Sequence, residues 1–442
     1  MSVPAPGPWG PTIEGGDRWR LLLRLGSALG VLSLVLVTAF GTTGFLLYQR
    51  AEANLERVDL EQLTETTPSE ARHFLVVGSD SREGLSEQDR RELRLGSFEG
   101  QRGDTIIYVS ITADREQVSL VSLPRDLVVE TPDGRIAKLT ERFAGGPDAV
   151  IESIGASYGL PINHYVSVSL GGFLDVVDTL GGVTIELDEP LIDPKSGADF
   201  PTAGVYDMSP EEALAFVRSR QGTQADYERI ERQQIFLRAV LRDLVDAGNL
   251  TNPVRLFRLV DDVSTSVTTD GRLGASQMRF LADDLRSAVL DGIPMTTLPS
   301  YATNLPAGPG VRAGSYVLPY QPGVAAIREA IAAGEPLPPR ATREEAAETV
   351  VALWSGGRGV TGTVVQPTLV FAGYQAGGAG AGPAELQAGE RTIVYALPDQ
   401  EDEARKVAGL LGAEVRALPD GATAPQDADV VVAVGDDAAN GG

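Results

Sequence analysis

Cysteine is absent from this 442-residue chain, and histidine occurs only twice. Without cysteine the chain has no disulfides, no thiol nucleophile and no cysteine-based zinc site. His73 and His164 both lie in apolar, β-branched runs, so we expect structural histidines rather than members of a Ser-His-Asp triad or a metal site. The side chains left for chemistry are carboxylates, arginines and hydroxyls, a set that suits magnesium and phosphate groups.

Positive charge is also scarce, because 37 lysines and arginines face 61 aspartates and glutamates, for a formal net charge of −24. Such an acidic balance argues against a nucleic-acid partner, whose phosphates favour a basic surface. Lysine occurs only at Lys138, Lys195 and Lys406. Arginine is therefore abundant everywhere, and only its position is informative. A phosphate-bearing ligand must be held by local basic residues or by a metal.

One uncharged run stands near the start of the chain, at residues 25–49. A helix of that length spans the ~30 Å hydrocarbon core of a bilayer. Arginines at 18, 20 and 24 precede the run, which predicts a cytoplasmic N-terminus and an extracytoplasmic remainder. The alternative is a signal peptide cleaved near residues 51–53. Because signal peptides have shorter apolar regions, of about 7–15 residues, we favour a single-pass anchor in the cell membrane.

The composition of the chain divides it into further segments. Residues 1–24 form an expected cytoplasmic tail, and residues 50–68 a polar stalk. From 69 to 300, strand-length β-branched runs alternate with helical patterns, which predicts a layered α/β domain. Residues 301–345 are rich in Pro, Gly and Ala and are expected to form a linker or a loose segment that wraps around the domain. A smaller α/β domain follows at 346–438.

The expected elements can be listed by domain. In the larger domain we expect strands at 73–78, 105–112, 118–123, 164–169 and 183–187, and helices at 148–158, 172–180 and 226–247. Ser209, Pro210 and Glu212 supply a cap, a first-turn proline and a capping-box carboxylate for another helix. In the smaller domain we expect strands at 392–396, 414–417 and 429–435 and a helix at 400–411. The glycine-rich residues 376–383 are expected to be mobile.

Five short motifs place polar residues, most of them Asp and Arg, at the ends of these elements. They are GSDSR at 78–82, RGDT at 102–105, PRD at 124–126, RSR at 218–220 and DYERIERQQ at 226–234. Each motif alone is weak, since an Arg-Asp pair after a strand is more often a surface ion pair. Together they predict one site, because ligands gather at the carboxyl ends of strands in open α/β sheets.

The residue types in these motifs point to a phosphate and a divalent cation. Magnesium takes one or two carboxylates together with phosphate oxygens, and Asp80 with Asp104 would supply the carboxylates. The planar fork of arginine grips phosphate oxygens in a bidentate way. Arg218 and Arg220 share a side only where the chain is extended, so we expect the preceding helix to end near residue 217 or 218.

The ordered set of motifs resembles the LytR-CpsA-Psr family over roughly residues 70–245. Lys138, the run at 162–168 and the Gly-Gly-Val turn at 181–183 add to the likeness. Residues 346–438 resemble, more weakly, the LytR C-terminal domain. The resemblance implies an α-β-α catalytic domain with a central mixed sheet. It also implies a Mg²⁺-dependent phosphotransferase that moves a glycopolymer from a polyprenyl-pyrophosphate carrier to peptidoglycan through a phosphodiester bond.

The resemblance also implies roles for individual residues. Asp80 and Asp104 match the magnesium-linked aspartates, and Asp226 is a candidate general base; with Arg102 and Arg125 they form the expected catalytic set. The expected pyrophosphate-binding residues are Arg102, Arg125, Lys138, Arg218, Arg220, Arg229 and Gln233. Asp226, Arg229 and Gln233 are spaced three and four apart, so they share a helix face. The expected lining of an apolar pocket for the polyprenyl chain is Phe143, Ile154, Val166 and Phe173.

Three departures from the family pattern stand out. Gly103 replaces a frequent Ser, Asn163 replaces a frequent Asp, and residues 141–143 (ERF) replace a stretch of small residues beside Lys138. Two other functions stay open. One is a polyprenyl-pyrophosphate hydrolase, in which water replaces the sugar hydroxyl. The other is a non-catalytic, polyprenyl-phosphate-binding protein of wall assembly, against which the complete set of motif residues argues. The expected partners are the carrier-linked glycopolymer, peptidoglycan and the bilayer.

Overall fold

The computed structural model describes most of the chain beyond residue 52. The described residues are 45, 49–50, 52–67, 70–79, 103–221, 225–245, 264–265, 267–273, 293–355, 364–383, 389–419 and 421–439. The chain divides into a unit of residues 1–53 and a unit of residues 54–442, and the elements below belong to the second. In the part of the chain so described, no helix is long and apolar enough to cross a membrane. The expected span at 25–49 lies almost entirely outside that part.

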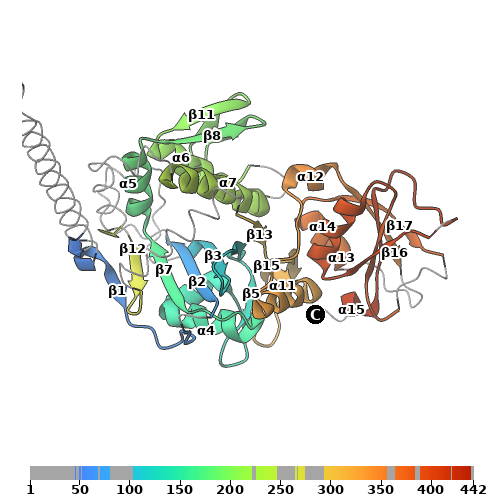
Figure 1. Cartoon of the computed structure of the whole chain (residues 1–442), viewed down its shortest axis with the longest axis horizontal. Helices are drawn as coiled ribbons and strands as arrows, with labels where there is room; N and C mark the ends of the chain where they lie inside the picture. The colour runs from blue at the N-terminus through green and yellow to red at the C-terminus, as the bar shows by residue number, and fades with distance from the viewer. Residues whose placement is uncertain are drawn as a thin grey trace, which may run out of the picture. The chain divides into compact units, whose positions relative to one another are not determined.

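A seven-stranded sheet forms the centre of the larger domain, with strand order β1-β12-β7-β2-β3-β4-β13 (Figure 1). Its strands are β1 (Glu56–Val58), β2 (Arg72–Ser79), β3 (Gly103–Ile111), β4 (Val118–Ser122), β7 (His164–Val168), β12 (Val267–Asp270) and β13 (Met295–Thr297). β2 runs antiparallel to β3 and parallel to β7, and β4 runs parallel to β13. The expected mixed sheet is confirmed, and four of its strands, β2, β3, β4 and β7, lie where the β-branched runs predict them.

Helices cover both faces of this sheet. On one face α4 (Gly146–Tyr158) and α11 (Gln321–Ala333) pack on a core that includes Leu75 and Tyr108. On the other face α7 (Ala225–Val245) packs through Leu237 and Leu241. A layered α-β-α domain is thus confirmed, because the apolar side chains on each face of the sheet are buried against the apolar faces of helices.

A third core cluster lies beside α7. It joins α5 (Leu170–Leu180), α6 (Pro210–Arg218) and the antiparallel pairs β8–β11 and β9–β10. Those strands are β8 (Val183–Leu187), β9 (Leu191–Asp193), β10 (Ala198–Phe200) and β11 (Gly204–Met208). The Ser209 side chain accepts from the Glu212 backbone N–H and the Glu212 carboxylate accepts from the Ser209 N–H, so the capping box is confirmed.

The expectation of a linker at 301–345 is wrong over most of that segment. It contains the hairpin of β14 (Ser300–Leu305) and β15 (Gly314–Pro319), followed by α11. The glycines and prolines mark the boundaries of these elements. Gly310 has a positive φ in the hairpin turn, a proline stands in the first turn of α11, and Gly334 ends the helix in the left-handed conformation.

A second, five-stranded mixed sheet forms the C-terminal lobe, with order β17-β16-β20-β18-β19. Its elements are β16 (Val350–Ser355), β17 (Gln375–Ala381), β18 (Ile393–Ala396), β19 (Glu414–Ala417), β20 (Val430–Ala433), α12 (Arg343–Glu348), α13 (Val365–Phe371), α14 (Glu401–Leu411) and α15 (Asp436–Ala439). The expected strands and helix are confirmed.

The glycine-rich stretch at 376–383 is an exception, because its first residues form β17 rather than a mobile segment. A Cβ on Gly377 would lie 3.1 Å from the Val351 carbonyl oxygen, and one on Gly382 2.7 Å from Trp354 Cγ. Glycine therefore lets this edge strand approach β16 and Trp354 closely.

Candidate functional site

The carboxyl end of β2 meets the start of β3 at a β-bulge. Gly78 pairs with Thr105 and Ser79 with Gly103, so Asp104 is the extra residue between them. Bulges of this kind re-aim a side chain at the rim of a sheet. Asp80 and Arg102 lie outside the described residues, next in sequence to the paired Ser79 and Gly103. The side chain of Asp104 is likewise not described, so the metal assignment stays a prediction.

Arg125, Asp126 and Lys138 form a charged cluster just beyond the end of β4. The Asp126 carboxylate lies 3.6 Å from Arg125 Nε and 3.1 Å from Lys138 Nζ. These side chains are 18–24% exposed, so they are screened from solvent but still reach it. Two cations, Arg125 and Lys138, thus share the Asp126 carboxylate. The sequence pointed to Arg125 and Lys138 but gave Asp126 no role.

The hairpin β14–β15 helps to position this cluster. The backbone N–H of Val317 in β15 donates to the Asp126 carbonyl oxygen at 3.0 Å. Lys138, at the end of β6 (Ile136–Lys138), also lies over the Tyr316 ring, with Nζ 5.3 Å from its centroid. Residues expected to form a linker therefore support two members of the site.

A pair of arginines, Arg218 and Arg220, lies at the end of α6. This helix ends at Arg218, and Ser219 is extended and buried, with φ −61° and ψ 140°. The expected helix end at Arg218 and the extended residue after it are confirmed. Arg218 is half-buried and Arg220 is exposed. The backbone N–H of Arg220 donates to the Asp193 carboxylate at 2.9 Å, which fixes the segment.

Arg232 is a positioning residue that the sequence did not single out. Its guanidinium donates to the carbonyl oxygens of Ser219, at 3.0 Å, and Gln221, at 3.1 Å, and it pairs with Glu228 at 3.3 Å. It therefore ties the first turns of α7 to the segment that carries Arg220. The Glu228–Arg232 spacing of four on a helix was the available signal.

Helix α7 carries the remaining candidates. Arg229 is buried and Gln233 half-buried, whereas the side chain of Asp226 is not described. The neighbouring Gln234 donates through Nε2 to Ser122 Oγ at 2.9 Å, and Ser122 is the last residue of β4. This bond places α7 beside the strand end from which Arg125 follows. Helix α7 therefore contacts both the end of β4 and, through Arg232, the segment of the fourth motif.

Two of the three departures from the family pattern are coupled. A Cβ on Gly103 would lie 2.4 Å from Cζ of Phe143, so the Phe143 ring occupies the space that a serine would need. A larger side chain at 143 therefore requires the glycine at 103. The third departure, Asn163, is buried; its Oδ1 accepts from the His73 backbone N–H at 2.7 Å and its Nδ2 donates to the Thr64 carbonyl oxygen.

The four residues expected to line one apolar pocket are not brought together. Phe143 and Ile154 belong to the core under α4, whereas Val166 packs on the opposite face of the sheet. Phe173 stacks on Phe236 of α7, with ring centroids 4.8 Å apart. Core packing explains all four positions, because they belong to three different apolar clusters.

Both histidines have structural contacts. His73 is buried and stacked on Tyr108, and burial lowers the pKa of its imidazole to about 4, so it is neutral near pH 7. His164 Nδ1 lies 3.2 Å from the fully buried Asp270, which links β7 to β12. Burial alone would raise the pKa of Asp270, but hydrogen bonds from His164 and the Tyr165 N–H outweigh it, and the pKa is lowered.

Within the described ranges no three His, Asp or Glu side chains could hold a metal.

Comparisons with known proteins match this architecture. The model of the LytR_cpsA_psr family matches residues 42–326. The probable cell wall biosynthesis protein LcpB of Corynebacterium glutamicum is 32% identical over 280 residues, which cover 63% of this chain and 66% of that protein. The teichoic acid transferase TagU of Enterococcus faecalis, named polyisoprenyl-teichoic acid–peptidoglycan teichoic acid transferase, is 32% identical over 196 residues, 44% of this chain and 62% of that protein.

Solved structures point to the same fold. The LytR-Csp2A-Psr enzyme from Actinomyces oris superposes with a TM-score of 0.50 at 24% identity, covering 64% of this chain and 96% of that one. The chain spans slightly less than two thirds of the length of the two curated relatives above. The family match ends within α11, so it includes the hairpin β14–β15 and leaves out the C-terminal lobe.

Proposed function

The chain belongs to the LytR-CpsA-Psr family, and we propose that it transfers a glycopolymer from a polyprenyl-pyrophosphate carrier to peptidoglycan. The teichoic acid transferases among its relatives support this function. The observation that carries it is the charged cluster at the end of β4, where Arg125 and Lys138 share Asp126. In a chain of net charge −24, two cations that lie together just beyond the carboxyl end of a strand suit a pyrophosphate.

Magnesium is proposed as the cofactor, held by Asp80 and Asp104. Both carboxylates are hard oxygen donors of the kind that Mg²⁺ prefers. Asp104 lies at the β-bulge opposite the end of β2, and Asp80 is the residue that follows β2 in the sequence. When bound, the ion would neutralise charge on the pyrophosphate oxygens. Arg102, Arg125, Arg218 and Arg220 would grip the same oxygens and stabilise the charge that develops in the transition state.

The proposed reaction is an in-line displacement at phosphorus. The oxygen of a peptidoglycan hydroxyl bonds to the phosphorus that carries the glycopolymer, while the bond from that phosphorus to the bridging oxygen breaks. Polyprenyl phosphate leaves with the bond electrons, and a phosphodiester remains. Asp226 is the proposed base that takes the hydroxyl proton.

The place of action is a proposal of its own. Residues 25–49 would anchor the protein in the cell membrane, with the catalytic domain outside. Protease added to intact protoplasts should then remove the domain after residue 50. A full-length chain that stays protected, or a mature protein that begins near residue 54, would contradict the retained anchor.

Product analysis separates the transferase from the two other functions. Labelled, carrier-linked polymer and peptidoglycan oligomers are incubated with the full chain and Mg²⁺, and the products are identified by mass spectrometry. We expect polymer joined to peptidoglycan by a phosphodiester, together with polyprenyl phosphate. Release of polymer phosphate without joining would identify a hydrolase, and an unchanged carrier would identify a binding protein.

A further inference from the structure

The peptide unit between Ser219 and Arg220 is bound at both of its ends by charged side chains. Its N–H, which belongs to Arg220, donates to the Asp193 carboxylate at 2.9 Å. Its carbonyl oxygen, which belongs to Ser219, accepts from the Arg232 guanidinium at 3.0 Å. Asp193 is the last residue of β9 and Arg232 lies on α7, so two separate elements hold this unit. We call Asp193 and Arg232 the peptide clamp.

The peptide clamp restricts the backbone torsions on either side of this unit. A planar trans peptide turns as one body, so bonds at both of its ends together restrict ψ of Ser219 and φ of Arg220. The φ of Arg220 sets the direction in which its Cα–Cβ bond leaves the backbone. The next residue is also held, because Gln221 Oε1 accepts from the Ile192 N–H at 2.8 Å and its carbonyl oxygen accepts from Arg232 at 3.1 Å. The Arg220 side chain therefore starts from a fixed backbone.

Both bonds of the peptide clamp are charge-assisted and largely screened from solvent. Asp193 is 9% exposed, and the Arg232 side chain is 12% exposed. Burial alone would raise the pKa of Asp193, but hydrogen bonds from the Arg220 and Lys195 N–H groups outweigh it, and the pKa is lowered. Asp193 is therefore ionised near pH 7. Hydrogen bonds to ionised groups are roughly twice as strong as those between neutral groups.

The polar atoms of the peptide clamp already have partners within the protein. Asp193 Oδ2 accepts from the Arg220 N–H, and its Oδ1 accepts from the Lys195 N–H at 3.0 Å. Arg232 donates to two carbonyl oxygens and pairs with the Glu228 carboxylate at 3.3 Å. An effect of either residue on a bound phosphate therefore passes through the backbone that they hold.

We propose that Asp193 and Arg232 are positioning residues of the pyrophosphate site, which hold Arg220 in the direction that its contact with the pyrophosphate requires. The proposal rests on the proposed function, in which Arg220 binds pyrophosphate oxygens. Its physical basis is preorganisation, because a side chain on a fixed backbone loses less conformational freedom when it binds. Direction matters for arginine in particular, since its planar fork binds phosphate only in a defined orientation.

The affinity of the full chain in nanodiscs for geranylgeranyl pyrophosphate, a short polyprenyl pyrophosphate, tests the peptide clamp. Asp193→Asn leaves one oxygen for two N–H donors, and Arg232→Met removes both carbonyl contacts. We expect each variant to bind the probe about three- to tenfold more weakly than wild type, and no more weakly than Arg220→Ala. Arg232→Lys keeps the charge and should recover part of the loss. Wild-type affinity in Asp193→Asn and Arg232→Met overturns the proposal.

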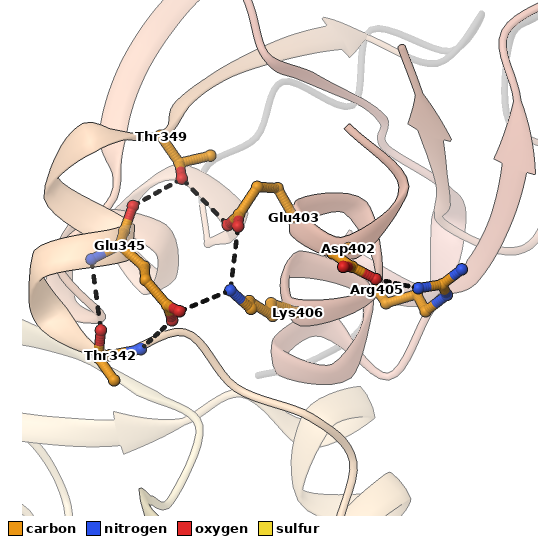
Figure 2. Close-up of polar contacts among 7 residues, drawn as sticks. All are labelled: Thr342, Glu345, Thr349, Asp402, Glu403, Arg405 and Lys406. Carbon is orange, nitrogen blue, oxygen red and sulfur yellow. Dashed lines mark hydrogen bonds and ion pairs between the residues drawn. The ribbon is translucent and has the colours of Figure 1, made fainter. Parts of the chain in front are cut away.

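Two substitutions in the C-terminal lobe are the matched controls. Figure 2 shows Asp402 and Arg405 of α14, an ion pair whose side chains are 83% and 59% exposed. Asp402→Asn and Arg405→Met change the same residue types as the clamp variants, and both should bind the probe as wild type does. A loss of affinity in these controls as large as in the clamp variants overturns the assignment, because the effect would not be specific to the peptide clamp.

A double-mutant cycle with Arg220→Ala separates positioning from a purely structural role. The Arg220 N–H remains in that variant, so Asp193→Asn should lower the free energy of unfolding in both backgrounds, as measured by urea denaturation. Its effect on affinity should differ: in the Arg220→Ala background we expect a change of less than about twofold. The same loss of affinity with and without the Arg220 side chain overturns the proposal. Arg232→Met provides the same cycle from the other end of the peptide unit.

Transfer assays keep this proposal separate from the transferase function. If the wild type forms no phosphodiester product while the clamp variants still weaken probe binding through Arg220, the transferase function fails and the peptide clamp stands. If the wild type forms the product and the clamp variants bind and transfer as it does, the peptide clamp fails and the transferase function stands. Wild-type affinity in Arg220→Ala overturns the peptide clamp together with the phosphate contact of Arg220.

Discussion

Each of the two lobes carries a cluster of three charged side chains, and the signs of the charges in one cluster are the reverse of those in the other. At the end of β4 one carboxylate, Asp126, lies between two cations, Arg125 at 3.6 Å and Lys138 at 3.1 Å. In the C-terminal lobe one cation, Lys406, lies between two carboxylates, Glu345 at 2.9 Å and Glu403 at 3.0 Å. In the first cluster a carboxylate joins two cations, and in the second a cation joins two carboxylates.

The difference agrees with the binding role proposed for the first cluster and with a structural role for the second. The carboxylates of the second cluster are used within the lobe: Glu345 caps α12, and Glu403 accepts from Thr349. That cluster fastens α12 to α14. The first cluster lies just beyond the carboxyl end of a strand, where open α/β sheets bind ligands, and its two cations suit the proposed anionic substrate.

The largest expected effect concerns the proposed metal site at the same sheet edge. Asp104→Asn keeps the size of the side chain and removes its charge, so we expect Mg²⁺-dependent turnover to fall by about 100-fold or more. Release of polyprenyl phosphate at increasing Mg²⁺ measures this. Asp133→Asn, at an exposed turn, is the control and should behave like wild type. An unchanged magnesium dependence in Asp104→Asn would remove Asp104 from the metal site.

The crowded start of β3 gives the next effect. Gly103→Ser would push against Phe143 and should cost about 1–3 kcal/mol of unfolding free energy. The same change at Gly378, in the edge strand of the C-terminal lobe, meets no atom within 4 Å and should be nearly neutral. Urea denaturation compares the two. Because Phe143→Ala makes room, the effects of Gly103→Ser and Phe143→Ala should be less than additive; strict additivity contradicts the coupling.

The arginine pair after α6 gives a smaller effect. Arg220→Ala should slow turnover by about tenfold or more, and Arg220→Lys less, because lysine keeps the charge but loses the bidentate fork. Steady-state rates and thermal melts are measured together. Arg416→Ala is the control, because Arg416 forms an exposed ion pair with Glu414 in the C-terminal lobe, and it should leave the rate unchanged. Near-normal turnover in Arg220→Ala would assign Arg220 to the surface alone.

The smallest effect belongs to the cluster around Lys406 in the C-terminal lobe. A hydrogen bond from Lys406 is the largest cause of the lowered pKa of Glu345, whose ordinary value is 4.5. The pair therefore stabilises the lobe above about pH 4.5 and loses this contribution as the pH falls through the lower, folded value. The gain should be less than ~1 kcal/mol, because Glu345 is 42% exposed. Lys406→Met should flatten the acid side of the stability profile; a profile unchanged from wild type contradicts this role.

Local signals explain what the sequence predicted well. The cap at Ser209, the end of α6 at Arg218 and the β-branched strands depend on neighbours within a few residues. Composition gave wrong predictions for two segments. It predicted a mobile stretch where β17 lies and a linker where β14, β15 and α11 lie. Their glycines serve close strand packing, and their prolines and glycines mark turns and helix ends.

Contacts distant in sequence account for the missed site residues. Gln234 bonds Ser122 across 112 positions, and Arg232 reaches back from α7 to the carbonyl of Ser219. Asp126 gains its role only because β6 brings Lys138 to it. No local pattern contains these pairings. The motifs therefore indicated which strand ends carry the site, and the fold supplied the residues that position it.

The most direct test of the account is the affinity of the full chain in nanodiscs for polyprenyl pyrophosphate, measured for Arg125→Met and Arg405→Met. Arg125 belongs to the cation-rich cluster and Arg405 to a surface ion pair of the C-terminal lobe. We expect Arg125→Met to bind about tenfold or more weakly than wild type and Arg405→Met to bind equally well. Equal affinity of Arg125→Met and wild type would contradict the proposal that the cations beyond the end of β4 bind the pyrophosphate.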